Sequence, residues 1–260
     1  MEKRKFLSVF SIMVVLLALT VVGTTSCGNR VKRAEVEKNV KMLNKRCPIT
    51  MDGVGQLTRV TVEDDDVVFS YLFTYPLELS VLKQNSQLLM ENILACMSFD
   101  KNGQQIVSDI AEAGMGMKVV YTVSGDNDSF SVRANNDELK KAISEPMTPR
   151  KALDLQIKIA KLQLPQQIDE VTTQTDTYIE GNYFYYVYTI NEQYGEINPS
   201  QEDLDQIKEE IKQRLHHPAM KSVLNLIVKN DLGLCMRYIG ERPRKEINIE
   251  FAVDELRVIR

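Results

Sequence analysis

The chain has 260 residues, of which 43% are hydrophobic and 26% charged, and its formal net charge at pH 7 is −4. This composition is typical of a folded protein with room for two domains of ordinary size, and it argues against a disordered chain. The mild negative charge and the lack of a basic stripe exclude nucleic acid as an expected partner, because phosphate binding needs clustered Lys and Arg.

Residues 1–26 have the pattern of a secretion signal. A charged start is followed by a 17-residue apolar run from Phe6 to Val22, and small and hydroxyl residues then lead directly to Cys27. This pattern resembles a bacterial lipoprotein signal, in which the cysteine receives the lipid and starts the mature chain. A transmembrane anchor and cleavage without lipid are the alternatives. Because no acidic run follows Cys27, the resemblance implies a lipid-anchored protein on the periplasmic face of the outer membrane.

The next part of the chain alternates between helical and extended patterns. Apolar residues at helical spacing predict a helix over residues 34–45, and a second one over about 104–113 that ends at a glycine. Period-two apolar patterns predict strands over 57–62, 67–74, 117–123 and 129–133.

The mature chain contains an internal duplication. A shift of 117 residues, without gaps, places Tyr71 on Tyr188 and Gly116 on Gly233, and the apolar pattern of residues 31–143 recurs in the same register. Two prolines within residues 145–149 prevent a continuous helix at the join. We therefore expect a signal peptide at 1–26, a first repeat domain at 27–145 and a second at 146–260.

The second copy repeats the order of elements. Its predicted strands are 175–179, 183–190, 234–239 and 247–253, and its later helices follow a Ser200–Asp203 cap pair and Pro218. The predicted fold class is α+β, with two tandem copies of an αββααββ unit. Because hairpins rather than crossovers connect the strands, each copy is expected to form an antiparallel sheet with helices on one face.

Three cysteines remain after Cys27, in a compartment where disulfides can form. An odd number allows at most one bridge and leaves one thiol over. We expect Cys47 and Cys96 as the first pair to test, with Cys235 free. Buried free thiols that act as small hydrophobic residues are the alternative.

The sequence offers no recognisable catalytic or metal motif, so no catalytic residue, metal or cofactor is predicted. His216 and His217 are adjacent, and neighbours on a helix do not share a face. The acidic run 63–66 lacks the spacing of a calcium loop and predicts a polar hairpin tip. The Asp-Glu pairs at 137–138 and 254–255 indicate helix capping.

An aromatic strand is the strongest candidate for a binding surface, and the candidate partner-binding residues are Tyr183, Tyr185, Tyr186 and Tyr188. Strand alternation places Tyr183 and Tyr185 on one face, with Tyr186 and Tyr188 on the other. One face should contact the helices. The other is either covered by the first copy or available to a partner.

Residues 164–172, the Tyr-x-Tyr strand and a later Gly-x-x-x-x-Tyr segment together resemble a small domain of uncharacterised bacterial secreted proteins. The resemblance covers about 75 residues of the second copy and implies no activity. The leading hypothesis is a non-enzymatic, membrane-tethered periplasmic lipoprotein that binds a protein or another envelope component as a scaffold. An inhibitor of a secreted or periplasmic enzyme and a hydrolase without a recognisable motif are the alternatives.

Overall fold

The computed structural model describes residues 29–51, 55–73, 79–99, 101–125, 128–191, 199–216, 218–240 and 245–259. The chain divides into two compact units, and the division falls at Pro149. We call residues 29–148 the first unit and residues 149–259 the second unit. The predicted signal peptide and Cys27 lie outside the described residues. Every described element follows residue 28, so a chain that begins there contains both units with their cores.

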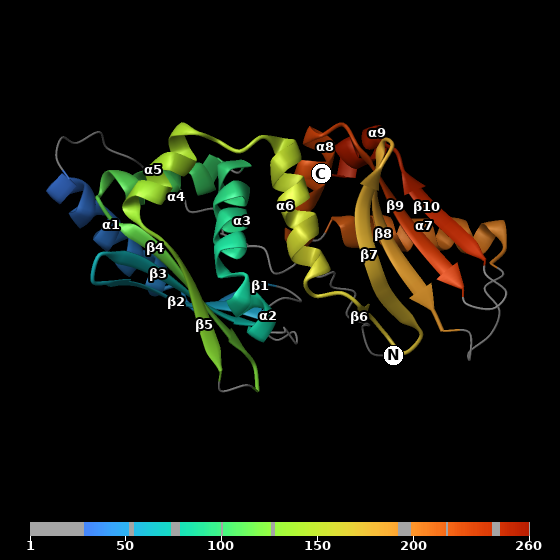
Figure 1. The fold of residues 1–260 in the computed structure, drawn as a ribbon, viewed down its shortest axis with the longest axis horizontal. Coiled ribbons are helices and arrows are strands. Elements are labelled where there is room, and N and C mark those ends of the chain that lie inside the picture. Colours follow the sequence, from blue (N-terminus) through green and yellow to red (C-terminus); the bar gives the residue numbers. More distant parts are fainter. Residues whose placement is uncertain are drawn as a thin grey trace. The chain divides into compact units, whose positions relative to one another are not determined.

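The first unit places helices beside a five-stranded sheet (Figure 1). Its elements are α1 (Asn29–Asn44), β1 (Ile49–Met51), β2 (Gly55–Glu63), β3 (Asp66–Phe73), α2 (Leu79–Gln84), α3 (Ser86–Phe99), α4 (Lys101–Glu112), β4 (Gly116–Val123), β5 (Ser129–Ala134) and α5 (Asn136–Ser144).

The second unit has the same layers (Figure 1). Its elements are α6 (Pro149–Lys161), β6 (Gln166–Gln167), β7 (Thr172–Glu180), β8 (Tyr183–Ile190), α7 (Gln201–Leu215), α8 (Pro218–Lys229), β9 (Gly233–Gly240), β10 (Glu246–Phe251) and α9 (Val253–Ile259). The predicted α+β class is confirmed. Each unit adds a short first strand and a closing helix to the predicted order, and the first unit also adds the short helix α2. None of the described helices combines the length and the hydrophobicity that a bilayer crossing needs.

Each sheet is mixed, whereas the sequence predicted purely antiparallel pairing. The strands follow the orders β1-β2-β3-β4-β5 and β10-β9-β8-β7-β6. The pairs β3–β4 and β8–β9 are parallel, and the remaining neighbours are antiparallel. The physical reason is the helical connection between the two middle strands, because a crossover returns the chain to the end of the sheet from which it started.

The two units repeat in the predicted gap-free register. Strands β2, β3, β4 and β5 each begin and end 117 residues before β7, β8, β9 and β10, and α4 stands in the same relation to α8. Even an irregularity recurs, since β2 has a bulge between Leu57 and Arg59, and β7 has one between Gln174 and Asp176. The two units are therefore similar, as predicted, although the described part of the second unit has no counterpart of α2.

Alternation along the strands decides which side of each sheet meets the helices. In β8, Phe184, Tyr186 and Tyr188 are fully buried, whereas Tyr183 and Tyr185 on the other side are only partly covered. Burying large aromatic side chains is a major source of stability in small domains. We call the side of each sheet that faces away from its helices the open face.

Helix caps match the sequence signals. Asn135 and Glu138 form a reciprocal capping box at the start of α5, and Ser200 and Asp203 form one at the start of α7. In α9, the Glu255 carboxylate accepts a hydrogen bond from the backbone N–H of Ala252. The repeated Asp-Glu pairs therefore serve helix starts, as predicted.

Candidate functional site

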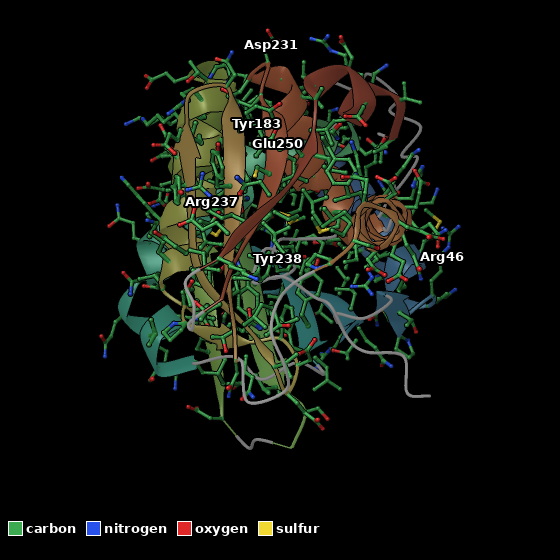
Figure 2. The ribbon with its side chains drawn as sticks, turned by 90° about the vertical axis from the view of Figure 1, so that its right-hand side faces the viewer. Arg46, Tyr183, Asp231, Arg237, Tyr238 and Glu250 are labelled. Atoms are coloured by element: carbon green, nitrogen blue, oxygen red, sulfur yellow. The ribbon has the colours of Figure 1, made fainter. Side chains whose placement is uncertain are left out.

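The tyrosines of β8 divide between the two sides of the second sheet. Tyr183 and Tyr185 lie on the open face (Figure 2 labels Tyr183). Tyr186 and Tyr188 are fully buried against the helices, so these two predicted binding residues cannot contact a partner. The prediction that Tyr186 and Tyr188 bind a partner is therefore wrong. They pack in the core instead, because every second side chain of a strand points to the same side of the sheet.

Tyr185 is part of an aromatic and cationic cluster that crosses three strands. The Tyr178 ring in β7 stacks on the Tyr185 ring with centroids 5.1 Å apart. The guanidinium carbon of Arg237 in β9 lies 4.5 Å from the centroid of the Tyr185 ring, within the range of a cation–π interaction. Arg237 also donates a hydrogen bond to the Tyr178 hydroxyl over 2.7 Å and one to the Asn248 side-chain oxygen over 3.3 Å. These contacts hold a charged group and two rings in one fixed arrangement.

Tyr183 reaches across the neighbouring strand at a glycine. A Cβ atom added at Gly233 would lie 2.5 Å from Cε1 of Tyr183, so only glycine leaves room for this ring. The Tyr183 hydroxyl lies close enough to the Glu250 carboxylate on β10 for the two to interact. Figure 2 places Tyr183 and Glu250 near each other, with Arg237 further along the same face. We call Tyr178, Tyr183, Tyr185, Arg237, Asn248 and Glu250 the tyrosine face.

Partial burial sets the protonation of this face. Burial raises the pKa of Tyr183, and the Glu250 carboxylate raises it further. Burial also raises the pKa of Tyr178 and Tyr185, while the neighbouring Arg237 opposes the rise. Beneath the rings, burial raises the pKa of the Cys235 thiol to about 11, with Glu250 adding to the effect. The tyrosines and the thiol are therefore neutral at neutral pH, and Arg237 and Glu250 carry the charges of the face.

The sequence missed Tyr178, Arg237, Asn248 and Glu250. None of these residues lies on β8 with Tyr185. Tyr178 lies on β7, Arg237 on β9, and both Asn248 and Glu250 on β10. The signal that could have found them is the register, because Tyr185 lies opposite Tyr178 and beside Cys235 once the strands pair. The sequence did not predict the parallel pairing of β8 with β9, so it could not place the residues of β9 and β10 beside Tyr185.

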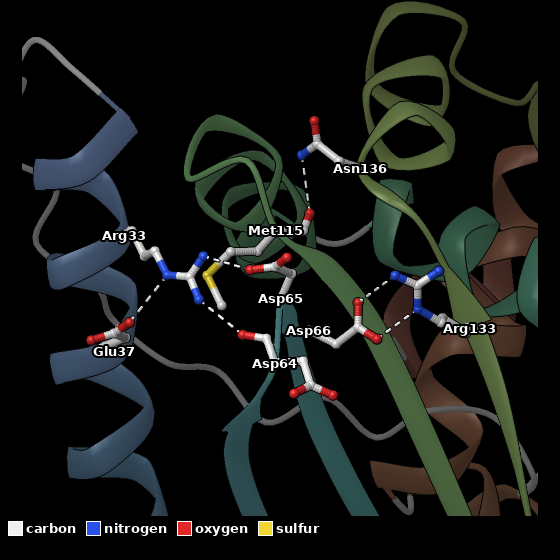
Figure 3. Close-up of polar contacts among 8 residues, drawn as sticks. All are labelled: Arg33, Glu37, Asp64, Asp65, Asp66, Met115, Arg133 and Asn136. Atoms are coloured by element: carbon white, nitrogen blue, oxygen red, sulfur yellow. Dashed lines mark hydrogen bonds and ion pairs between the residues drawn. The ribbon is translucent and has the colours of Figure 1, made fainter.

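The acidic hairpin tip of the first unit is structural. Arg33 in α1 donates hydrogen bonds to the Asp65 carboxylate over 2.7 Å and to the Asp64 carbonyl over 2.9 Å (Figure 3). Arg133 in β5 contacts both Asp66 carboxylate oxygens, at 2.6 and 2.9 Å. Two arginines thus hold the carboxylates of Asp65 and Asp66, and the tip ties α1 and β5 to the hairpin, in agreement with the prediction of a polar turn.

Of the two adjacent histidines, the structure describes only His216. His216 is exposed at the end of α7, and its Nδ1 lies 2.9 Å from the Lys212 carbonyl oxygen, while His217 lies outside the described residues. Within the described ranges, no three His, Cys, Asp or Glu side chains gather closely enough to hold a metal ion.

The three described cysteines are free thiols, so the expected bridge between Cys47 and Cys96 is not formed. The Cys47 sulfur lies 3.7 Å from the Leu43 carbonyl oxygen, one turn earlier in the chain. Burial raises the pKa of the Cys96 thiol in α3. The alternative of thiols that act as small hydrophobic groups describes this structure.

Comparison with known proteins adds little to this geometry. No protein-family model matches the chain, and no curated protein is similar to it. Among solved structures, the crystal structure of a "putative secreted protein" from Pseudomonas aeruginosa is similar at 12% sequence identity with a TM-score of 0.33. The match covers 45% of this chain and 99% of that protein. Its description names neither a ligand nor an activity.

Proposed function

We propose that the chain is a non-enzymatic binding protein of the bacterial cell envelope, anchored by lipid at Cys27 on the periplasmic side of the outer membrane. In this proposal the second unit binds a partner protein through the tyrosine face, and the fold is the scaffold that presents this face. The lipoprotein-like signal supports the location, and the tyrosine face supports the binding role.

The arrangement of Arg237 on Tyr185 and Tyr178 carries the proposal. Tyr and Arg are enriched at the centres of protein interfaces, where they provide a large contact area and directed hydrogen bonds. Here the cation–π contact and two hydrogen bonds already fix the Arg237 side chain. A partner would therefore bind with little loss of side-chain entropy.

The rim of the face indicates the chemistry of the partner. Glu180, Glu246 and Glu250 lie on the open side of the sheet around the tyrosines, and Arg237 is the cation among them. Tyrosine rings and carboxylates together favour a partner that presents Lys or Arg side chains. We propose a protein with a basic surface segment.

Site-directed photocrosslinking tests the proposal. A benzophenone amino acid replaces Tyr185 in one strain and Thr122, on the open face of the first sheet, in a control strain. We expect a discrete crosslinked product in cells from position 185 that is absent from position 122. Adducts of equal yield at both positions, or at neither, would contradict a binding role for the tyrosine face.

A substitution series sharpens this test without exposing new surface. The changes Tyr178→Thr, Tyr185→Val and Arg237→Val introduce the residues that the first unit carries at the equivalent strand positions, Thr61, Val68 and Val120. Because these residues already fit the same sheet positions, folding should be retained. Crosslinking from a neighbouring site, Thr189, should then be lost.

The lipid anchor is tested separately. Cys27→Ala should abolish incorporation of labelled palmitate, whereas Cys47→Ala should not. Labelling that persists in the Cys27 variant would contradict the anchor and leave the binding proposal to its own experiment.

A further inference from the structure

The first unit contains a cavity of about 130 Å³ between α1, α4 and the strands β2 and β3. Its walls are mainly apolar, with Val36 and Val40 from α1, Val67 and Phe69 from β3, and Ile110 from α4. This cavity is partly open to solvent, and its volume is close to that of an enclosed apolar cavity of roughly 150 Å³ that binds benzene. The space therefore suits an apolar group of about six carbon atoms.

At two positions that line the cavity, the second unit has a larger or an apolar side chain. Phe184 stands where the first unit has Val67, and Leu226 stands where it has Asp109. Phe184 is fully buried and Leu226 is 1% exposed. The two units therefore differ at these two positions, where the second unit has larger or apolar side chains that are buried.

Charged groups mark the two ends of the cavity. Asp109 lines it near the first turns of α1, where it accepts a hydrogen bond from Gln105 and interacts with Lys32. Arg46 lines it just beyond the end of α1, is exposed, and makes no side-chain hydrogen bond or ion pair with the described residues. Lys32 and Arg46 are about 20 Å apart along the helix direction, at 1.5 Å per residue. The acidic group is already engaged, whereas the cationic group is available.

We propose that this cavity binds the hydrocarbon end of a medium-chain alkyl carboxylate, with Arg46 binding the carboxylate. The guanidinium can donate two parallel hydrogen bonds to a carboxylate, which fixes the orientation of the ligand. The chain of the ligand enters between α1 and the sheet, where Val40 and Phe69 exclude water from it. Burial of each methylene group favours binding.

Calorimetric titration with sodium octanoate tests the proposal, with the chain from residue 28 to 260 as the protein. Octylamine and octanol have the same hydrocarbon chain with a cationic or a neutral head, so they report the contribution of charge. We expect octanoate to bind at one site, and the other two compounds to bind at least about tenfold more weakly, because they cannot form the charge-assisted hydrogen bonds to Arg46. Preference for octylamine would assign the site to Asp109 and overturn the proposal.

Two substitutions import the residues of the second unit. Arg46→Gln introduces the counterpart of Gln163 and should weaken octanoate binding about tenfold, leaving octanol unchanged. Val67→Phe introduces the counterpart of Phe184 and should abolish binding of all three compounds. Arg59→Gln, at an exposed position on β2, is the matched charge control and should bind like the wild type.

Asp109→Leu provides a second way of filling the cavity, in case Val67→Phe does not fold. Circular dichroism establishes folding of each variant before titration. The proposal is wrong if a folded Val67→Phe or Asp109→Leu variant binds octanoate with unchanged affinity. It is also wrong if Arg46→Gln and Arg59→Gln weaken octanoate binding equally, because the ligand then binds elsewhere.

Discussion

The open face of the second sheet carries tyrosine and arginine where the first sheet carries smaller residues. Tyr178, Tyr185 and Arg237 occupy the strand positions that Thr61, Val68 and Val120 occupy in the first unit. The backbone register is the same in both, down to the position of a bulge. The duplicated core therefore fixes the fold, while the open face is free to change its chemistry.

One contact across the sheet makes this difference concrete. In the second unit Tyr183 passes over Gly233 to the Glu250 carboxylate. In the first unit the equivalent positions hold Asp66, Gly116 and Arg133, and the arginine binds the aspartate as an ion pair. The glycine of the central strand is common to both, because a Cβ atom at Gly116 would collide with the Asp66 side chain. In both units a side chain passes over this glycine to the outer strand, but the first unit forms an ion pair there and the second a tyrosine–carboxylate contact.

The largest expected effect concerns the buried side of the same sheets. Phe184→Val gives the second unit the residue of the first and leaves a cavity under α6 and α8. The free energy of unfolding should fall by about 2–3 kcal/mol, because the packed ring is lost and the surroundings relax only partly. Urea denaturation of the 28–260 chain measures this loss. Val258→Ala, at an exposed position of α9, is the control and should change stability by less than about 0.5 kcal/mol.

A second prediction concerns Cys235 beneath the tyrosine face. Its pKa of about 11, against an ordinary 9.0, means roughly a hundredfold less thiolate at pH 8. Iodoacetamide should therefore modify Cys235 at least about a hundredfold more slowly in the folded than in the urea-unfolded chain, as followed by mass spectrometry. Between about pH 9 and 11 the Cys235 thiol stays protonated in the folded chain but ionises in the unfolded chain. The free energy of unfolding should therefore decline as the pH rises over this range. Rapid native alkylation at pH 8 would contradict the packing of the face.

The third prediction concerns a buried amide that only the second unit has. Gln174 is fully buried, neither of its amide atoms has a hydrogen-bond partner among the described residues, and the first unit has Leu57 at that position. Gln174→Leu should raise the free energy of unfolding by about 1–2 kcal/mol, because an unsatisfied buried polar group is removed. Gln213→Leu on exposed α7 should not stabilise the protein. A loss of stability in the Gln174 variant would indicate that the amide is hydrogen-bonded.

The smallest effect is expected at the ion pair that replaces the Tyr183–Glu250 contact. Arg133 is half exposed, so Arg133→Ala should cost no more than about 1 kcal/mol, and the cost should shrink in high salt. Thermal unfolding at low and high salt measures this. A cost that does not depend on salt would mean that the side chain stabilises the sheet through packing instead.

The sequence predicted the parts of this structure that depend on local periodicity and on the repeat. The alternation of β8, the hairpin turns and the 117-residue register follow from neighbouring residues, and the caps at Ser200 and Glu138 follow from short motifs. It did not predict the parallel β3–β4 and β8–β9 pairs, which depend on helical crossovers. It therefore missed the contact between Arg237 and Tyr178, whose positions are 59 residues apart and meet only through that pairing.

The outer strands β5 and β10 have a neighbour on one side only in their sheets. Such edges invite pairing with strands of other molecules, which leads to aggregation. The outward side chains of β10 include Glu246 and Glu250, and β5 carries Arg133. Charge on these edges disfavours strand addition between copies, and therefore opposes fibre formation at high protein concentration.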